Sequence, residues 1–282
     1  DSSVFGGAAG LYVGWNWLAG TAPTADNSAG VGATPTAGSV KIDGSNLGSA
    51  LAGSLAATRL SANTTNGFSI ISYTGVNPLD PATVAHGLSQ KPELVIIKRT
   101  DAGTNWWIVG SDELTSWDYY VSLNATDAQA SGGYFESTAP TASVIELRND
   151  GDASVNGNDN TYVAYAFHSV EGYSKIGSYE GNGSTDGTFI YTGFRPSWLM
   201  VKKTSGTNGW IIEDNKRNPY NPEDTRLWAN LNSAETTAGG GYADFDFVSN
   251  GVKIRGDSSN YNTSGATNLY IVFAESPFKY AN

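Results

Sequence analysis

The chain has 282 residues, of which 16 are Lys or Arg and 27 are Asp or Glu, so its formal net charge is −11 at pH 7. This acidic balance argues against nucleic acid as a partner, because phosphate backbones are bound by concentrated Lys and Arg. Cysteine is absent, which excludes disulfides, thiolate zinc sites and cysteine nucleophiles.

Residues 1–20 are predicted to be the closing strand of an upstream repeat. The segment LYVGW at 11–15 has the shape of TYVAY at 161–165, which lies near the end of a complete repeat. A coincidental aromatic strand is the alternative interpretation. On the repeat interpretation, the chain begins inside an earlier copy and belongs to a longer protein.

Residues 21–66 consist largely of Ala, Gly, Ser and Thr and contain no aromatic residue. Such a segment cannot offset its ordering entropy alone, so we expect either a flexible linker or a strap ordered by its neighbours. Leu47, Leu51 and Leu55 follow helical i, i+4 spacing, which predicts a short helix at 47–60. That helix would pack on its own domain or on partner chains, and the second arrangement favours a homotrimer.

Residues 67–171 and 172–282 repeat one another. GFSIISYTG at 67–75 returns as GYSKIGSYEG at 172–181, and PELVIIKRT at 92–100 returns as PSWLMVKKT at 196–204. A period of roughly 105 residues is too long for a solenoid unit, so each copy is expected to be a whole domain. The paired basic residues at 98–99 and 202–203 are interpreted as solvated strand ends.

Each repeat is predicted to be built from strands, because its short apolar runs are separated by Gly, Asn, Ser and Thr. Continuously apolar runs such as residues 94–97 indicate central strands buried on both faces. We therefore expect an all-β chain of tandem antiparallel β-sandwich, jelly-roll-like domains. The predicted strands are 68–73, 93–99, 106–110, 119–124, 143–147 and 162–168 in the first copy, and 174–179, 198–203, 209–213, 226–230, 243–248, 251–255 and 269–275 in the second.

Several segments carry a resemblance to a known family. Together with the repeated segments above, HGL at 86–88, TYVAYAF at 161–167 and FAESPFKYAN at 273–282 resemble a repeated β-rich domain of tail-fibre-like virion proteins of marine bacteriophages. The resemblance covers nearly the whole chain, but it supplies no catalytic or receptor-binding residues. It implies an oligomeric virion component, located outside the host cell, that meets the host surface.

Catalytic chemistry has few candidates in this chain. We interpret His86 and His168, the two histidines, as structural rather than as members of a Ser/His/Asp set. Glycoside hydrolysis remains an alternative because a pair of carboxylates suffices for it. The candidate pairs, of which only the last shares one face of a strand, are Asp112 with Glu113, Glu213 with Asp214, and Asp244 with Asp246.

The loop at 149–160 alternates oxygen-bearing side chains in the manner of a calcium-binding loop. Asp150, Asp152 and Asn156 are its candidate metal ligands, and calcium is the one cofactor considered. The loop lacks the Glu that would complete a regular twelve-residue calcium site. Because Asn and Asp next to Gly also simply form turns, a turn without metal is the favoured interpretation.

Tryptophans are the remaining candidates for glycan recognition, since a planar ring can cover the apolar face of a sugar. Trp106, Trp117 and Trp228 are the candidates for glycan binding or intersubunit contact, with core packing as the alternative for each. We expect a structural and adhesive component of a phage virion appendage, without catalytic residues and without membrane insertion. Its expected partners are other virion proteins and host-surface polysaccharide. The alternatives are a capsid-decorating or fibre-shaft protein and a glycan depolymerase.

Overall fold

The computed structural model describes residues 12–76, 81–103, 107–148, 153–237 and 244–277. These residues form strands joined by turns and loops and contain no helix, so the all-β prediction is confirmed. None of the described segments could cross a membrane as a helix.

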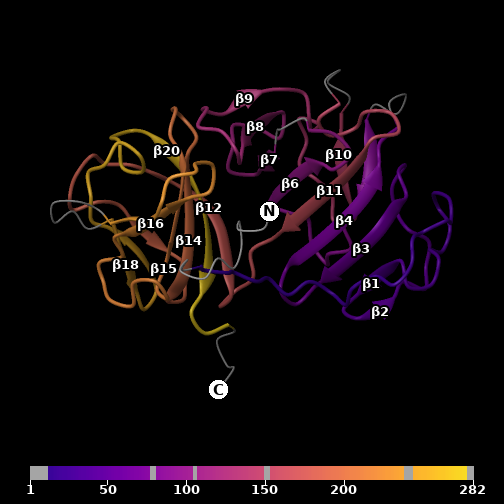
Figure 1. Cartoon of the computed structure of the whole chain (residues 1–282), viewed down its shortest axis with the longest axis horizontal. Coiled ribbons are helices and arrows are strands. Elements are labelled where there is room, and N and C mark those ends of the chain that lie inside the picture. Colours follow the sequence, from indigo (N-terminus) through magenta and orange to yellow (C-terminus); the bar gives the residue numbers. More distant parts are fainter. Residues whose placement is uncertain (1–11, 77–80, 104–106, 149–152, 238–243, 278–282) are drawn as a thin grey trace, which may run out of the picture.

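The largest sheet has nine strands in the order β2-β1-β3-β4-β11-β6-β7-β8-β9 (Figure 1). Neighbouring strands are antiparallel except β1 and β3, which are parallel. The strands are β1 (Val40–Ile42), β2 (Ser45–Asn46), β3 (Ala57–Asn63), β4 (Phe68–Thr74), β6 (Leu94–Arg99), β7 (Trp107–Ser111), β8 (Tyr119–Ser122), β9 (Ala130–Ser131) and β11 (Thr161–Phe167).

A six-stranded sheet follows in the second half, in the order β12-β20-β14-β15-β16-β17. Two smaller sheets complete the fold, with orders β10-β5 and β13-β19-β18. Their strands are β5 (Ala82–Ala85), β10 (Val144–Leu147), β12 (Ser174–Glu180), β13 (Phe189–Tyr191), β14 (Pro196–Lys203), β15 (Trp210–Asp214), β16 (Thr225–Trp228), β17 (Thr236–Thr237), β18 (Phe245–Val248), β19 (Gly251–Ile254) and β20 (Thr267–Ala274).

The helix predicted at 47–60 is wrong. Residues 57–63 form β3, which adds to the edge of β4, and the sheet therefore continues across residue 66 into the segment expected to be a linker or strap. Leu51 and Leu55 are buried, but through an extended chain in which Leu55 bridges to Val84. The free edge of β4 offers a ladder of backbone hydrogen bonds, which outweighs three leucines at helical spacing in a run interrupted by Gly48 and Gly53.

The closing strand predicted within residues 1–20 is also not formed by its described residues, 12–20. Residues 12–19 belong to no strand, although their side chains alternate between exposed and half-buried positions. Trp15 and Trp17 are the half-buried aromatic residues, and they pack on the second half of the chain, against Trp198. This segment is thus held by side-chain packing rather than by a backbone ladder.

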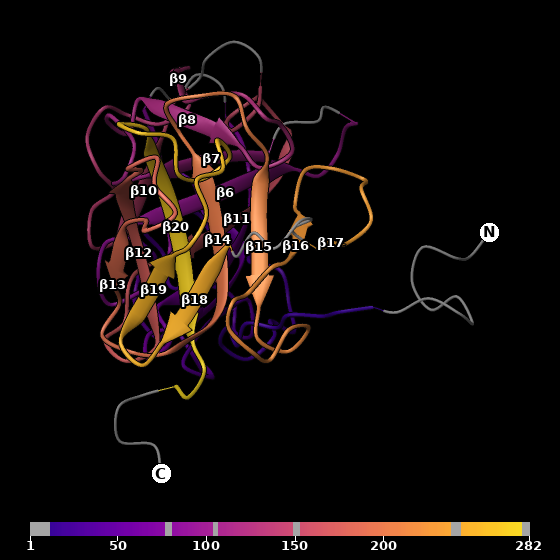
Figure 2. The same cartoon turned by 90° about the vertical axis from the view of Figure 1, so that its left-hand side faces the viewer.

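The buried side chains form three clusters that alternate with the sheets. One cluster joins the nine-stranded sheet to β5 and β10, and a second joins the six-stranded sheet to β18 and β19. The third lies between the two large sheets and includes Leu94, Trp198 and Trp210. Figure 2 shows the resulting layers, with β18 and β19 in front of the six-stranded sheet and the strands of the nine-stranded sheet behind it.

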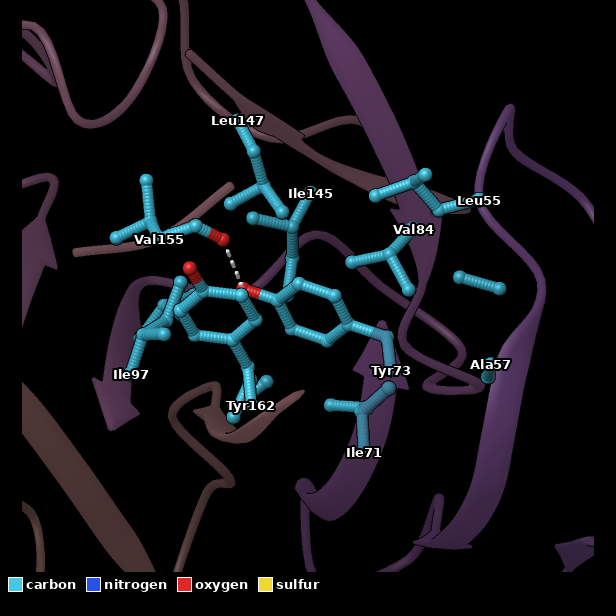
Figure 3. Packing of buried hydrophobic residues seen from close by; sticks show 14 of the residues in the cluster. Leu55, Ala57, Ile71, Tyr73, Val84, Ile97, Ile145, Leu147, Val155 and Tyr162 are labelled. Atoms are coloured by element: carbon cyan, nitrogen blue, oxygen red, sulfur yellow. Dashed lines mark hydrogen bonds between the residues drawn. The ribbon is translucent and has the colours of Figure 1, made fainter. Parts of the chain in front are cut away.

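The first core contains a buried tyrosine hydroxyl (Figure 3). Tyr73 on β4 stacks on Tyr162, and its hydroxyl donates to the carbonyl oxygen of Val155 at 2.7 Å. In the second half, the hydroxyl of Tyr179 on β12 donates to the carbonyl of Tyr261, also at 2.7 Å. Burial raises the pKa of both tyrosines well above the usual value, which favours the protonated, donating form.

Replacing Tyr73 or Tyr179 by phenylalanine should lower the free energy of unfolding by about 1 to 2 kcal/mol each, because each change leaves a buried carbonyl without its donor. Urea denaturation measures both effects. Tyr220 is 79% exposed, so Tyr220→Phe is the matched control and should be near neutral. Equal stability of all three variants and the parent would contradict the assigned role of the two hydroxyls.

Candidate functional site

Trp117 and Trp228, the two selected tryptophans that the structure describes, do not form an exposed platform. Trp117 is only 3% exposed, its indole Nε1 donates to Asp112 at 2.8 Å, and its ring packs edge-on against Phe135. A ring so enclosed cannot stack on a sugar, so Trp117 follows the alternative of core packing rather than glycan binding. Trp228 is half-buried against the second core, with the Arg226 guanidinium 5.7 Å from its ring. Trp106 lies outside the described residues.

Asn156, the one calcium candidate that the structure describes, is engaged in hydrogen bonds to the backbone. Asn156 is 1% exposed and both ends of its amide are used by Val76: the side-chain oxygen accepts from the backbone N–H at 3.0 Å, and the amide nitrogen donates to the carbonyl. In the second half, Asn262 accepts from the backbone N–H of Asn182 at 2.9 Å. Asp150 and Asp152 lie outside the described residues, within which no cluster of three His, Cys, Asp or Glu side chains could hold a metal.

The candidate carboxylate pairs are engaged in separate contacts. Asp244 is 1% exposed, whereas Asp246 is half-buried and forms an ion pair with Arg255 at 2.5 Å. Asp112 accepts from Lys91 and from Trp117, and Glu113 accepts from Ser178 across the joint between the halves. The pairs 112–113 and 244–246 thus accept from different donors, and Asp244 is buried out of reach of a substrate.

Asp244 is the centre of a buried polar network. Its carboxylate accepts hydrogen bonds from the guanidinium of Arg226 and from the hydroxyl of Tyr261, the latter at 2.6 Å. Glu213, on β15, faces the same network and is 1% exposed. Burial, and then the charge of Asp244, raises the pKa of Glu213 well above its usual value and favours the neutral acid. Glu213 and Asp244 are both buried, so this pair of acids is closed to solvent.

His86 is a buried structural residue, as the sequence analysis interprets it. Its Nδ1 accepts from the backbone N–H of Leu88 at 3.1 Å, so its Nε2, 3.2 Å from the carbonyl oxygen of Thr141, carries the proton. Burial lowers the pKa of His86 to about 4, so the ring is neutral at pH 7.

Acidification should therefore destabilise the protein through His86. Below pH 6.5 the His86 side chain binds a proton in the unfolded state, but in the folded state it does so only near pH 4. The free energy of unfolding therefore falls by up to about 3 kcal/mol as the pH decreases across that window. Burial also raises the pKa of Glu223 to about 7, which gives a contribution of opposite sign between pH 4.5 and 7. Denaturant titrations of the parent and of His86→Gln at several pH values isolate the histidine contribution. If the stability of the parent and that of His86→Gln had the same pH dependence, the histidine contribution would be contradicted.

The joint between the two large sheets is closed by buried polar contacts as well as by apolar packing. Trp210 on β15 is fully buried, and its Nε1 donates to the carbonyl of Ser122 in the first half at 2.9 Å. Lys202, interpreted from the sequence as a solvated strand end, is instead fully buried, and its Nζ donates to three carbonyls, including that of Thr126 at 3.1 Å. Burial lowers the pKa of Lys202 to about 8.

One end of this joint opens into an apolar cleft of about 310 Å³. Strands of both large sheets form its walls, and Trp15 and Trp17 of the N-terminal segment cover it. Phe68 and Phe167 stack on one wall with their ring centroids 4.6 Å apart, and Trp17 meets Trp198 edge-on at 5.4 Å. Sequence reasoning missed the cleft, because its residues lie on strands far apart in the chain.

An exposed aromatic pair lies on the opposite side of the second half, on the edge strand β13. Phe189 is 45% exposed and Tyr191 is 60% exposed, and they share a face because they are two residues apart. Lys175 lies 5.6 Å from the centre of the Tyr191 ring. In the sequence the run Phe189-Ile190-Tyr191 is apolar throughout, so it indicates a strand but does not show which side chains are exposed.

The comparisons with known proteins give a family and no individual relative. Searches of the curated proteins and of the solved structures found no match. A family model does match, over residues 42–277, and so spans both halves and the joint between them. The chain therefore belongs to the family described as a domain of unknown function, DUF7483.

Proposed function

We propose that this protein is a structural and adhesive component of a phage virion appendage. The observation that carries the proposal is the joint: two β-rich halves are held together by a buried apolar layer and by the cross-joint bonds of Trp210 and Lys202. A rigid unit of this kind suits a part that bears load and presents a fixed surface. The resemblance to tail-fibre-like virion proteins supplies the biological setting.

We further propose that the halves are tandem β-sandwich, jelly-roll-like repeats. The strand order β4-β11-β6-β7-β8-β9 has a counterpart in β12-β20-β14-β15-β16-β17. The hydroxyls of Tyr73 and Tyr179 each bond a carbonyl 82 residues ahead, and the Asn156 and Asn262 amides each bond a backbone N–H 80 residues behind. Matching offsets in two independent pairs of contacts support a duplicated domain.

Glycan contact is assigned to Phe189 and Tyr191 in place of the tryptophans predicted from the sequence. Two exposed rings on one strand face can cover the apolar face of a sugar, and Lys175 adds a donor beside them. One such site binds weakly. A homotrimer would present three sites at once, and avidity would then exceed the affinity of any single site.

Competition for adsorption tests adhesion. The purified protein should block attachment of the phage that carries it, and the double variant Phe189→Ser with Tyr191→Ser should block it at least tenfold less well. Tyr220→Ser is the matched control, because Tyr220 is a 79% exposed aromatic residue elsewhere on the surface. Absence of competition by the parent would refute adhesion and favour the fibre-shaft or capsid-decorating alternative.

The depolymerase alternative has its own assay. It requires release of reducing ends from host polysaccharide by the purified protein. We expect no release, because the candidate acids Glu213 and Asp244 are buried.

Light scattering at micromolar concentration tests the trimer, and a monomer there would remove the multivalent part of the proposal.

A further inference from the structure

The apolar cleft at the joint has the size and position of a small-molecule site. Its volume of about 310 Å³ lies at the lower end of the range for ligand pockets, roughly 300 to 1,000 Å³. Such pockets favour domain interfaces, and this cleft lies between the nine-stranded sheet and the six-stranded sheet. Its volume is about twice that of the roughly 150 Å³ apolar cavity that accommodates benzene in an engineered protein.

The lining of the cleft selects for an uncharged, flat ligand. Eight of the fourteen lining residues are aromatic, the other six are aliphatic, and none carries a charge. A sugar would leave most of its hydroxyl groups without partners there, and an ion would lose its hydration without compensation. An aromatic ring, by contrast, can pack edge-on or offset against rings such as Trp107 and Phe273.

Two polar atoms in the walls lack partners. The indole Nε1 atoms of Trp15 and Trp198 are buried and form no hydrogen bond within the described residues. Trp198 is 7% exposed and comes from β14, whereas Trp15 comes from the segment that covers the cleft. A buried donor left unpaired is costly, and both residues line the cleft. Neither atom has surface accessible to solvent, so a ligand oxygen can accept from either one only after that indole turns toward the cleft.

The N-terminal segment that lines the cleft leaves a route for a ligand to enter. Residues 12–19 belong to no strand, so Trp15 and Trp17 can leave the cleft without breaking a sheet. Their contacts with Trp198 and Phe273 are ring packing only. The cleft is also partly open to solvent, so a ligand can enter while the two large sheets keep their positions.

We propose that this cleft binds an uncharged aromatic molecule that carries one hydrogen-bond-accepting oxygen, held between the two large sheets beneath Trp15 and Trp17. The ring lies among the aromatic walls, and the oxygen accepts from the indole N–H of Trp198 or Trp15. This site is separate from the proposed glycan surface on β13, so either can fail without the other.

Acetophenone and cumene are the matched probes, because they have the same shape and differ in the carbonyl oxygen. Acetophenone should shift the indole N–H resonances of Trp15 and Trp198 saturably in NMR spectra of the full chain. Cumene should bind about three- to tenfold more weakly, which is the effect expected of one neutral hydrogen bond. Trp15→Phe and Trp198→Phe assign the two resonances, and Trp228→Phe is the control outside the cleft.

A cleft-filling variant keeps the test independent of the tryptophans. Ala229 lines the cleft, so Ala229→Leu should weaken acetophenone binding at least fivefold and leave the thermal midpoint within a few degrees of the parent. The proposal is overturned if neither probe gives a saturable shift, if the Trp228 resonance alone responds, or if Ala229→Leu binds acetophenone as well as the parent does.

Discussion

Replacing Trp210 by alanine is expected to lower the free energy of unfolding by about 4 kcal/mol, the largest effect of any single truncation at the joint. Trp210 is fully buried between the two large sheets and contributes both its ring and a hydrogen bond to Ser122 in the other half. Truncation therefore opens a cavity in the joint and leaves a buried carbonyl unpaired. Guanidinium denaturation followed by tyrosine and tryptophan signals measures the loss.

Two controls separate the contributions of Trp210. Trp210→Phe keeps most of the ring and removes the donor, so it should cost about 1 to 2 kcal/mol through the unpaired carbonyl. Trp228→Ala removes an indole that is only half-buried and lies outside the joint, so it should cost less than Trp210→Ala. If Trp210→Ala were as stable as the parent, the two halves would not be joined through this layer.

Most strands were predictable because their sequences contain runs of apolar residues. Leu94 enters the layer between the large sheets while Val95 and Ile97 enter the first core, so a continuous apolar run indeed marks a central strand buried on both sides. Strands β6, β11, β14 and β20 all lie within two residues of the predicted ranges. Their apolar content alone identifies them.

The strands that the sequence did not reveal are short or depend on a neighbour. β3 contains Arg59, Ser61 and Asn63, and it is a strand because it pairs with β4 on one side and β1 on the other. β2, β9 and β17 have two residues each, too few for any periodicity. Strands of this kind are decided by tertiary pairing rather than by their own composition.

The candidate sites were harder to predict for a related reason. Taken alone, Trp117 and Asn156 resemble ligand-binding residues. In the structure Trp117 packs in the core and bonds Asp112, and Asn156 bonds the backbone of Val76. Lys202 looks like a solvated cation, but its Nζ donates to one carbonyl of the first half of the chain and to two carbonyls of the second half. The cleft depends on residues from both sheets at once, and sequence reasoning about one repeat at a time cannot assemble them.

Replacing Asp244 by alanine is expected to cost about 4 kcal/mol, because it leaves a guanidinium unpaired in the interior. Asp244 is the acceptor for both Arg226 and Tyr261, and Arg226 is only partly accessible to solvent. Asp244→Asn keeps the shape and one acceptor oxygen while it removes the charge, so its cost should be smaller. Thermal and denaturant unfolding of the two variants give the comparison.

Asp246→Ala is the matched control for this network, since Asp246 lies two residues away and its partner Arg255 is accessible to water. It should cost about 1 kcal/mol or less, as for most exposed ion pairs.

A second variant checks the direction of the Glu213 pKa. Because the neutral acid is favoured there, Glu213→Gln should be as stable as the parent at pH 5 and gain relative to it as the pH rises. A loss for Glu213→Gln that grows with pH would instead mean that Glu213 is charged in the folded protein and that Arg226 neutralises two carboxylates.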